Sequence, residues 1–191
     1  GPKVVQPSGF GGAASIIALP DGTDSQVVYD KDGVRITVIR VNHAPISPAY
    51  GYRIDYKGRS VALSGDTVYS PSFVSAARGA DVMFHEALNK DMVSMLGSKL
   101  AERGQANNAQ IMHDIQNYHA SPEDAARAAK EAGAQALVLY HLVPPLPSKL
   151  IEPMFLGDAP KLFGGTLKVG HDGMIVSLPA GGKDVKFSEA W

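Results

Sequence analysis

The chain of 191 residues contains no cysteine, which excludes disulfide bonds, thiolate metal sites and cysteine nucleophiles. It has no run of basic residues and its formal net charge is −1, so a broad phosphate-binding surface is not indicated. No apolar stretch approaches the ~18 residues of a membrane span, and no signal peptide is recognised. The lack of cysteine fits either redox compartment; we expect a soluble protein, with the cytoplasm slightly favoured.

The residues that are present predict one folded domain. Hydrophobic residues make up 45% and charged residues 19%, a balance typical of globular rather than disordered proteins. A chain of this length can bury a core of its own. We therefore predict a single domain over residues 1–191, although residues 1–26, rich in Gly, Ser, Pro and Ala, show little periodicity.

Strands are predicted where β-branched and apolar residues cluster between turn signals. These segments are 27–29, 34–41, 50–56, 60–63, 81–84, 136–140, 166–169 and 174–178. Asp32-Gly33, Lys57-Gly58 and His171-Asp172-Gly173 are turn signals, so each is expected to close a hairpin between the strands that flank it.

Helices are predicted over 71–78, 89–104, 106–116 and 122–132. The last has the clearest boundaries, with Ser121 as a cap, Pro122 at the first helical position and Gly133 as the stop. Its alanines share one face at helical spacing, and we expect that face to pack on a sheet formed by residues 27–64. Strands that alternate with helices indicate a layered α/β architecture.

Histidines and acids follow several of the predicted strands, and these are His43, Asp66, His85, Glu86 and His141. A further histidine, His119, lies just before the helix over 122–132. Neutral imidazoles and carboxylates are ligands that divalent metals such as zinc prefer. The pattern therefore indicates part of a metal-dependent hydrolase.

Each of these residues alone also fits a structural role. Asp66 follows a glycine, which is common turn chemistry. His85 and Glu86 fit a polar pair that closes a strand, and His119 fits an ordinary residue before a helix cap. His141 is the hardest to explain structurally, because a buried strand rarely ends in a histidine without a partner. The shared position at the ends of apolar segments favours the metal site.

Over residues 27–145 these segments, in this order, resemble the carboxyl-terminal half of metallo-β-lactamase-fold hydrolases, specifically the ribonuclease Z-like branch. The resemblance implies an α/β fold, mainly the second half of an αββα sandwich. It implies two divalent ions, zinc or alternatively manganese, that share an activated hydroxide. His43 would bind one ion, His141 the other, and Asp66 would bridge both.

The resemblance also implies catalytic roles. His119 would donate a proton to the leaving oxygen, while His85 and Glu86 would lie behind the site, with Glu86 accepting a hydrogen bond from a ligand imidazole.

Two departures from the family pattern matter. The His-x-His-x-Asp-His motif, which supplies four of the family's seven ligands, is absent from this sequence. The sequence then is either a fragment or a metal-free relative, and we expect the chain alone to bind metal weakly. The second departure is the segment 142–147, Leu-Val-Pro-Pro-Leu-Pro, which replaces a Ser-x-Arg-Tyr-like segment.

Because of these two departures and the near-zero net charge, RNA is a possible substrate but not the favoured one. A phosphodiester is the first choice; a small ester, sulfate ester or lactone is the alternative, and a small molecule or phosphoester is the expected binding partner. A catalytically inactive binding or regulatory module is the rival from another class. A serine hydrolase is disfavoured because no Gly-x-Ser-x-Gly motif occurs. A homodimer is left open.

Overall fold

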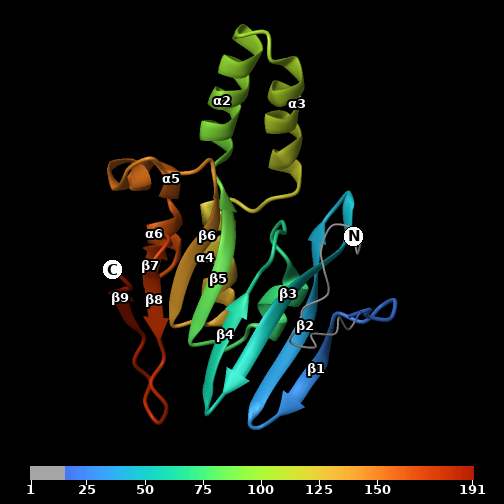
Figure 1. Ribbon diagram of the computed structural model, residues 1–191, viewed down its shortest axis with the longest axis vertical. Coiled ribbons are helices and arrows are strands. Elements are labelled where there is room, and N and C mark those ends of the chain that lie inside the picture. The colour runs from blue at the N-terminus through green and yellow to red at the C-terminus, as the bar shows by residue number, and fades with distance from the viewer. Residues whose placement is uncertain (1–15) are drawn as a thin grey trace, which may run out of the picture.

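The computed structural model describes residues 16–191, so the expectations for residues 1–15 lie outside the described part. The chain forms a seven-stranded sheet in the order β1 to β7 and a two-stranded sheet of β8 and β9 (Figure 1). The strands are β1 Ser25–Lys31, β2 Val34–His43, β3 Ile46–Tyr56, β4 Arg59–Leu63, β5 Val82–Leu88, β6 Ala136–Val143, β7 Thr166–Val169, β8 Met174–Ser177 and β9 Lys186–Glu189.

The first half of the large sheet is antiparallel and is built from the predicted hairpins. Lys31 pairs with Val34 across Asp32-Gly33, and all four φ angles at Asp32-Gly33 and Lys57-Gly58 are positive. Two-residue turns with φ above zero at both positions match the right-handed twist of paired strands. The turn signals in the sequence therefore fix the register of this half, and both hairpin predictions are confirmed.

The second half of the sheet is parallel, with β4, β5, β6 and β7 side by side. Its connections contain all the α-helices of the described residues: α1 Pro71–Ala76, α2 Lys90–Glu102, α3 Ala106–Asp114, α4 Pro122–Ala132, α5 Glu152–Leu156 and α6 Ala159–Leu162. Helices α2 and α3 form a hairpin that projects beyond the sheet (Figure 1). None of the helices in residues 16–191 has the length and apolar character needed to cross a membrane.

Helix α4 begins and ends as predicted. Ser121 and Asp124 form a reciprocal capping box, and Gly133 ends the helix at φ 65°. The predicted alanine face is buried: Ala125, Ala128, Ala129 and Ala132. Among the strands, the helix contacts β5 and β6 most, rather than the sheet portion formed by residues 27–64 on which it was predicted to pack. Ile39, Val41 and Ala62 of that portion still belong to the same core as the helix alanines. The parallel strands carry the small and apolar partners that this helix needs.

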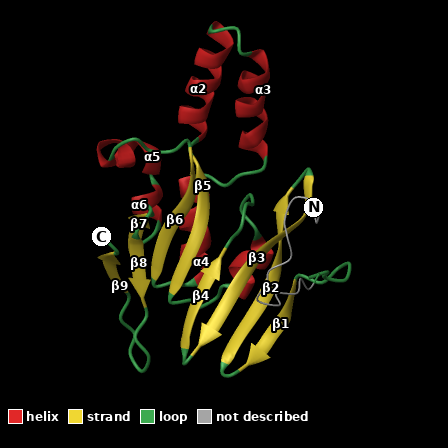
Figure 2. Ribbon diagram, in the orientation of Figure 1, coloured by secondary structure: helices red, strands yellow, loops and turns green. Residues whose placement is uncertain are grey.

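The large sheet has two different faces, because successive residues of a strand point to opposite sides. Met83 and Leu137 join the main core with α1 and α4. Val82 and Val138 lie on the other face, where Met174 and other side chains of the β8–β9 region pack on them. Figure 2 shows the small β8–β9 sheet beside the carboxyl-terminal strands of the large one.

The predicted hairpin between residues 166–169 and 174–178 does not form. Strand β7 pairs parallel with β6, and β8 pairs with β9 in the second sheet. The turn at residues 171–173 thus carries the chain from one layer to the other, because burial of Met174 and Val176 against the opposite face outweighs local pairing. Strands β5 and β6 also run three to four residues further than predicted.

Candidate functional site

The predicted site residues gather at one edge of the large sheet. Strands β2, β4, β5 and β6 run in the same direction, since β3 is antiparallel to both β2 and β4. Their carboxyl ends therefore meet at one edge, as in other sheets that bind ligands there. His43 ends β2, Asp66 follows β4, and His141 lies near the end of β6. His119 lies in the loop before α4.

The side chains of three histidines lie side by side at this edge. The ring centroids of His43 and His119 are 4.9 Å apart, and those of His119 and His141 are 5.7 Å apart. Nε2 of His141 lies 3.6 Å from Oδ2 of Asp66. Two ligand atoms on one tetrahedral zinc lie ~3.3 Å apart, given Zn–N and Zn–O distances of ~2.0–2.1 Å. The spacing of His141 and Asp66 therefore fits a shared ion.

His43 is oriented in the way that a metal ligand requires. Its Nδ1–H donates to the carbonyl oxygen of Tyr118 over 2.8 Å, the tautomer being assigned from this acceptor. The Tyr118 ring also packs edge-on against the imidazole, with centroids 5.0 Å apart. A histidine held at one ring nitrogen by a carbonyl presents the other nitrogen as a lone-pair donor.

His141 adopts a strained backbone conformation. Its φ is +46°, in the left-handed region that residues other than glycine seldom occupy. The pairing of β5 with β6 slips here: Glu86 pairs with Tyr140 and Ala87 with Leu142, so His141 is an extra residue in β6. A bulge of this kind redirects a side chain at the end of a strand. Backbone strain of this kind persists only where the surrounding structure holds it in place, and it is frequent at functional sites.

Glu86 connects the two loops of the site. Its fully buried carboxylate accepts three hydrogen bonds at Oε1, from Nδ1 of His119 at 2.9 Å, from the Thr67 amide at 3.0 Å and from the Ala120 amide at 3.2 Å. Its own amide donates to Oγ of Ser64 over 3.0 Å. Oε2 has no partner within residues 16–191. The carboxylate thus orients His119, whereas the sequence suggested a ligand imidazole.

The Glu86 contact also shifts the pKa of His119. Burial alone lowers the pKa of His119, but the hydrogen bond from Nδ1 to Glu86 and the negative charges of Glu86 and Asp66 outweigh it and hold the pKa above its ordinary 6.5. A raised pKa favours the protonated ring, which can donate a proton from its other nitrogen.

The loop that carries Asp66 is fixed by its neighbours. Thr67 is fully buried; its Oγ1 accepts from the Asn42 amide and donates to the Asn42 carbonyl, both over 3.1 Å. The Gly65 amide donates to the hydroxyl oxygen of Tyr140 over 3.0 Å. Burial is the main reason that the pKa of Tyr140 is raised. Sequence reasoning selected Asp66 in this loop but missed Thr67 and Tyr140.

His85 is not brought to the site. It points to the helix-covered face, where its ring packs edge-on against Phe73 with centroids 5.7 Å apart. Its Nδ1–H donates to the Glu86 carbonyl over 2.8 Å, and Nε2 has no partner among the described residues. Burial lowers the pKa of His85, so the ring is neutral. Alternation along β5 places His85 and Glu86 on opposite faces.

The residues present form only part of a metal centre. Within residues 16–191 no cluster of three or more histidine and acid side chains is placed to hold an ion. Residues 1–15 contain no histidine, cysteine, aspartate or glutamate. The assignment of His43, Asp66 and His141 as metal ligands therefore stays a prediction. The Asp66–His141 pair and the presented nitrogen of His43 lie at the same edge and make up an incomplete ligand set.

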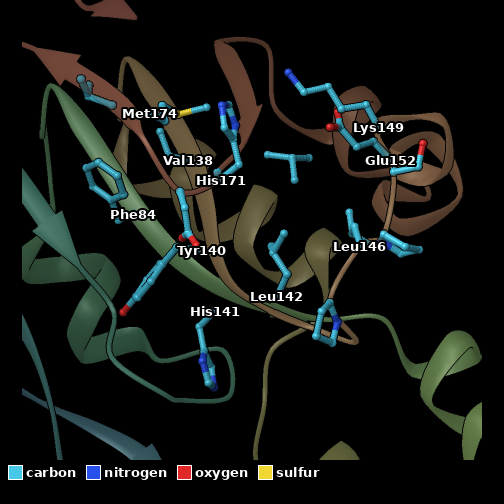
Figure 3. A pocket seen from close by; sticks show the side chains of 17 residues that line it. Phe84, Val138, Tyr140, His141, Leu142, Leu146, Lys149, Glu152, His171 and Met174 are labelled. Atoms are coloured by element: carbon cyan, nitrogen blue, oxygen red, sulfur yellow. The ribbon is translucent and has the colours of Figure 1, made fainter. Parts of the chain in front are cut away.

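A cavity of about 820 Å³ opens beside His141. Its lining includes the aromatic side chains of Phe84 and Tyr140 and the basic side chains of Lys149 and His171 (Figure 3). The cavity therefore combines an aromatic wall with two basic side chains next to a candidate ligand.

The sequence and the fold both match known proteins. Residues 5–142 match the beta-lactamase superfamily domain. The ribonuclease Z of Mycobacterium avium is 37% identical over 160 residues, which are 84% of this chain and 52% of that protein. A putative ribonuclease Z of Mycobacterium tuberculosis is 37% identical over 145 residues, 75% of this chain and 59% of that protein. The chain thus spans about half the length of the curated relatives it matches.

Two solved structures share the fold. The metallo-β-lactamase fold protein YhfI from Bacillus subtilis superposes with a TM-score of 0.54 at 23% identity, covering 76% of this chain and 50% of YhfI. The short form of human tRNase Z gives a TM-score of 0.52 at 21% identity, covering 82% of this chain and 48% of that one. The prediction of an α/β metallo-β-lactamase-like fold is confirmed.

Proposed function

The chain belongs to the beta-lactamase superfamily domain family, in its ribonuclease Z-like branch, and on that premise we propose that it supplies part of a metal-dependent hydrolase site that acts on a phosphodiester. His43 would hold one divalent ion, His141 the other, and Asp66 both. Zinc is the first candidate, because imidazole and carboxylate donors suit it. When bound, the two ions supply an activated water and stabilise negative charge on the reacting oxygens.

The observation that carries this proposal is the pairing of His119 with Glu86 beside His43 and His141. Glu86 accepts the hydrogen bond from Nδ1 of His119 and favours the charged ring, because it raises the pKa. The ring lies 4.9 Å from His43 and 5.7 Å from His141, measured between centroids. His119 would donate its Nε2 proton to the leaving oxygen, and Glu86 would stabilise the charged ring before transfer.

Substrate class rests on the relatives. The proteins named ribonuclease Z that share 37% identity favour a phosphodiester, and RNA is one such substrate. The net charge of −1 does not indicate an extended basic surface, so a small phosphodiester fits this chain at least as well. A sulfate ester or a lactone remains the alternative.

One observation favours a second function, that of an inactive binding module. The described residues offer no complete ligand set for a metal ion. In that case the site edge would bind a partner without turnover, and added zinc would not change the behaviour of the protein.

The test is hydrolysis of three substrates by this chain with zinc: bis(4-nitrophenyl) phosphate, an aryl sulfate and a simple lactone. The chain is assayed alone and with a separate polypeptide that carries a His-x-His-x-Asp-His segment. We expect low turnover alone, a gain on mixing, the highest rate on the phosphodiester, and loss of both zinc binding and turnover in Asp66→Ala. Faster turnover of the lactone would overturn the substrate class, and zinc-independent behaviour of all mixtures would favour the binding module.

A further inference from the structure

Tyr140 lies where the two candidate ligands Asp66 and His141 meet. It is the residue before His141 in β6, and it lines the cavity beside that histidine (Figure 3). Its ring packs edge-on against Phe84, with centroids 6.5 Å apart and planes at 79°. Its hydroxyl oxygen accepts a hydrogen bond from the Gly65 amide over 3.0 Å. Tyr140 therefore joins the strand that carries His141 to the loop that carries Asp66.

The hydrogen bond to Tyr140 anchors the Gly65 amide, in addition to the bonds that fix the same loop through Ser64 and Thr67. Gly65 has a φ of +62°, and a Cβ at this position would collide with the carbonyl oxygen of Tyr50. No side chain can therefore be added at residue 65 to anchor the loop. Its amide is available for anchoring, and Tyr140 binds it from the neighbouring strand. Asp66 is the next residue, so the direction of its side chain follows the Gly65 peptide.

The other end of the connection is the bulge at His141. Tyr140 still pairs in register with Glu86, and the slip occurs directly after it. His141, at φ +46°, then turns toward the site edge, where its Nε2 lies 3.6 Å from Oδ2 of Asp66. Tyr140 is thus the last residue of β6 that pairs in register before the bulged His141. Its ring packs against Phe84.

We propose that Tyr140 is a positioning residue that sets the spacing of Asp66 and His141 for a shared metal ion, through its hydrogen bond to the Gly65 amide. The inference rests on the proposed function only in taking these two residues as ligands. Groups that orient ligands are worth ~10–100-fold in metal affinity. Packing alone does not require the hydroxyl, since a phenylalanine would fill the same space beside Phe84.

The test compares Tyr140→Phe with Tyr29→Phe, a control at an exposed tyrosine of β1, in the full 191-residue chain. The first measurement needs no metal: amide hydrogen exchange of Gly65 should speed up ~2–10-fold in Tyr140→Phe, as expected for the loss of one hydrogen bond. It should stay at the wild-type rate in Tyr29→Phe. Unchanged exchange at Gly65 in Tyr140→Phe would overturn the inference, whether or not the chain binds metal.

The second measurement is the affinity for Zn²⁺ alone by calorimetric titration, with the metal-free unfolding temperature recorded for each variant. We expect Tyr140→Phe to weaken zinc binding ~10–100-fold while the unfolding temperature falls by no more than ~4 °C. Asp66→Ala separates the two hypotheses. If Asp66→Ala leaves zinc binding intact, the proposed function fails. If Asp66→Ala weakens zinc binding and Tyr140→Phe does not, only the role of Tyr140 fails.

Discussion

His85 and Glu86 are neighbours in β5, yet their side chains lie on opposite faces of the sheet and have different environments. On the helix-covered face, the ring of His85 is buried against Phe73 and stays neutral. On the other face, the carboxylate of Glu86 is equally buried but accepts three hydrogen bonds at one oxygen. At this end of β5 the first face belongs to the packed core, whereas the second carries a polar network that connects two loops.

The comparison shows that burial alone does not identify a functional residue. Both side chains are fully buried, and both leave one polar atom without a partner in the described part of the chain. They differ in what they hold: Glu86 connects the Thr67 and His119 loops, whereas His85 bonds only the carbonyl of the next residue. A buried polar group matters to a site when other site residues depend on it.

The largest effect is expected from His119→Ala in the metal-loaded enzyme. Loss of a general acid should lower turnover by ~10²–10⁴-fold for a substrate with a poor leaving group. A nitrophenolate needs little protonation, so its release should be far less affected. Rates on both substrates and zinc content measure this, with His113→Ala, an exposed histidine of α3, as the control. Equal losses on both substrates would show that His119 only orients substrate or supports the fold.

Glu86→Ala should produce the next largest effect, on stability. It removes the acceptor of His119, Thr67 and Ala120 within a buried network, and breaking a buried pair costs ~3–5 kcal/mol. Urea unfolding of the metal-free chain measures the loss. A change below ~1 kcal/mol would mean that water replaces these bonds readily and that the two faces of β5 are more alike than the contacts indicate.

A change of pH should have a smaller effect on stability, and the effect should have opposite signs for His119 and His85. The pKa of His119 is raised, so its contribution to stability is fully present below the unfolded value of ~6.5 and is lost as pH rises through the folded pKa. The pKa of His85 is lowered, so its neutral burial costs stability as pH falls below ~6.5.

Unfolding in urea from about pH 5.5 to about pH 8.5 separates these two contributions. His119→Ala should remove the loss at high pH, and His85→Leu should remove the loss at low pH. Identical pH profiles for both variants and the wild type would contradict both assignments.

The smallest effect is expected from His85→Leu at about pH 8, where the histidine is neutral. Leucine is close in size and has no polar atom to leave unpaired, so the free energy of unfolding should change by less than ~1.5 kcal/mol. Turnover should stay within about twofold of wild type, because the side chain faces the helices. A loss of turnover as large as that of His119→Ala would contradict this assignment and indicate a catalytic role for His85.

The sequence predicted the local elements of the fold well where they have strong local signals. The turns at Asp32-Gly33 and Lys57-Gly58, and the ends of α4 at Ser121 and Gly133, lie where their residues require them. The order of histidines and acids also indicated the site edge, because strands of one direction deliver their carboxyl ends together. The turn at residues 171–173 had a hairpin signal as well, yet it joins two layers.

The sequence by itself determined the family, the strands that lead to His43, Asp66 and His141, and the helix that follows His119, because caps, turns and periodicity are local properties. Only the tertiary structure decided which side chains meet. Alternation places Glu86 at the site and His85 in the core, and a single bulge turns His141 toward Asp66. Which face a residue occupies depends on pairing and packing between distant segments, and these interactions have no signature in the residue itself.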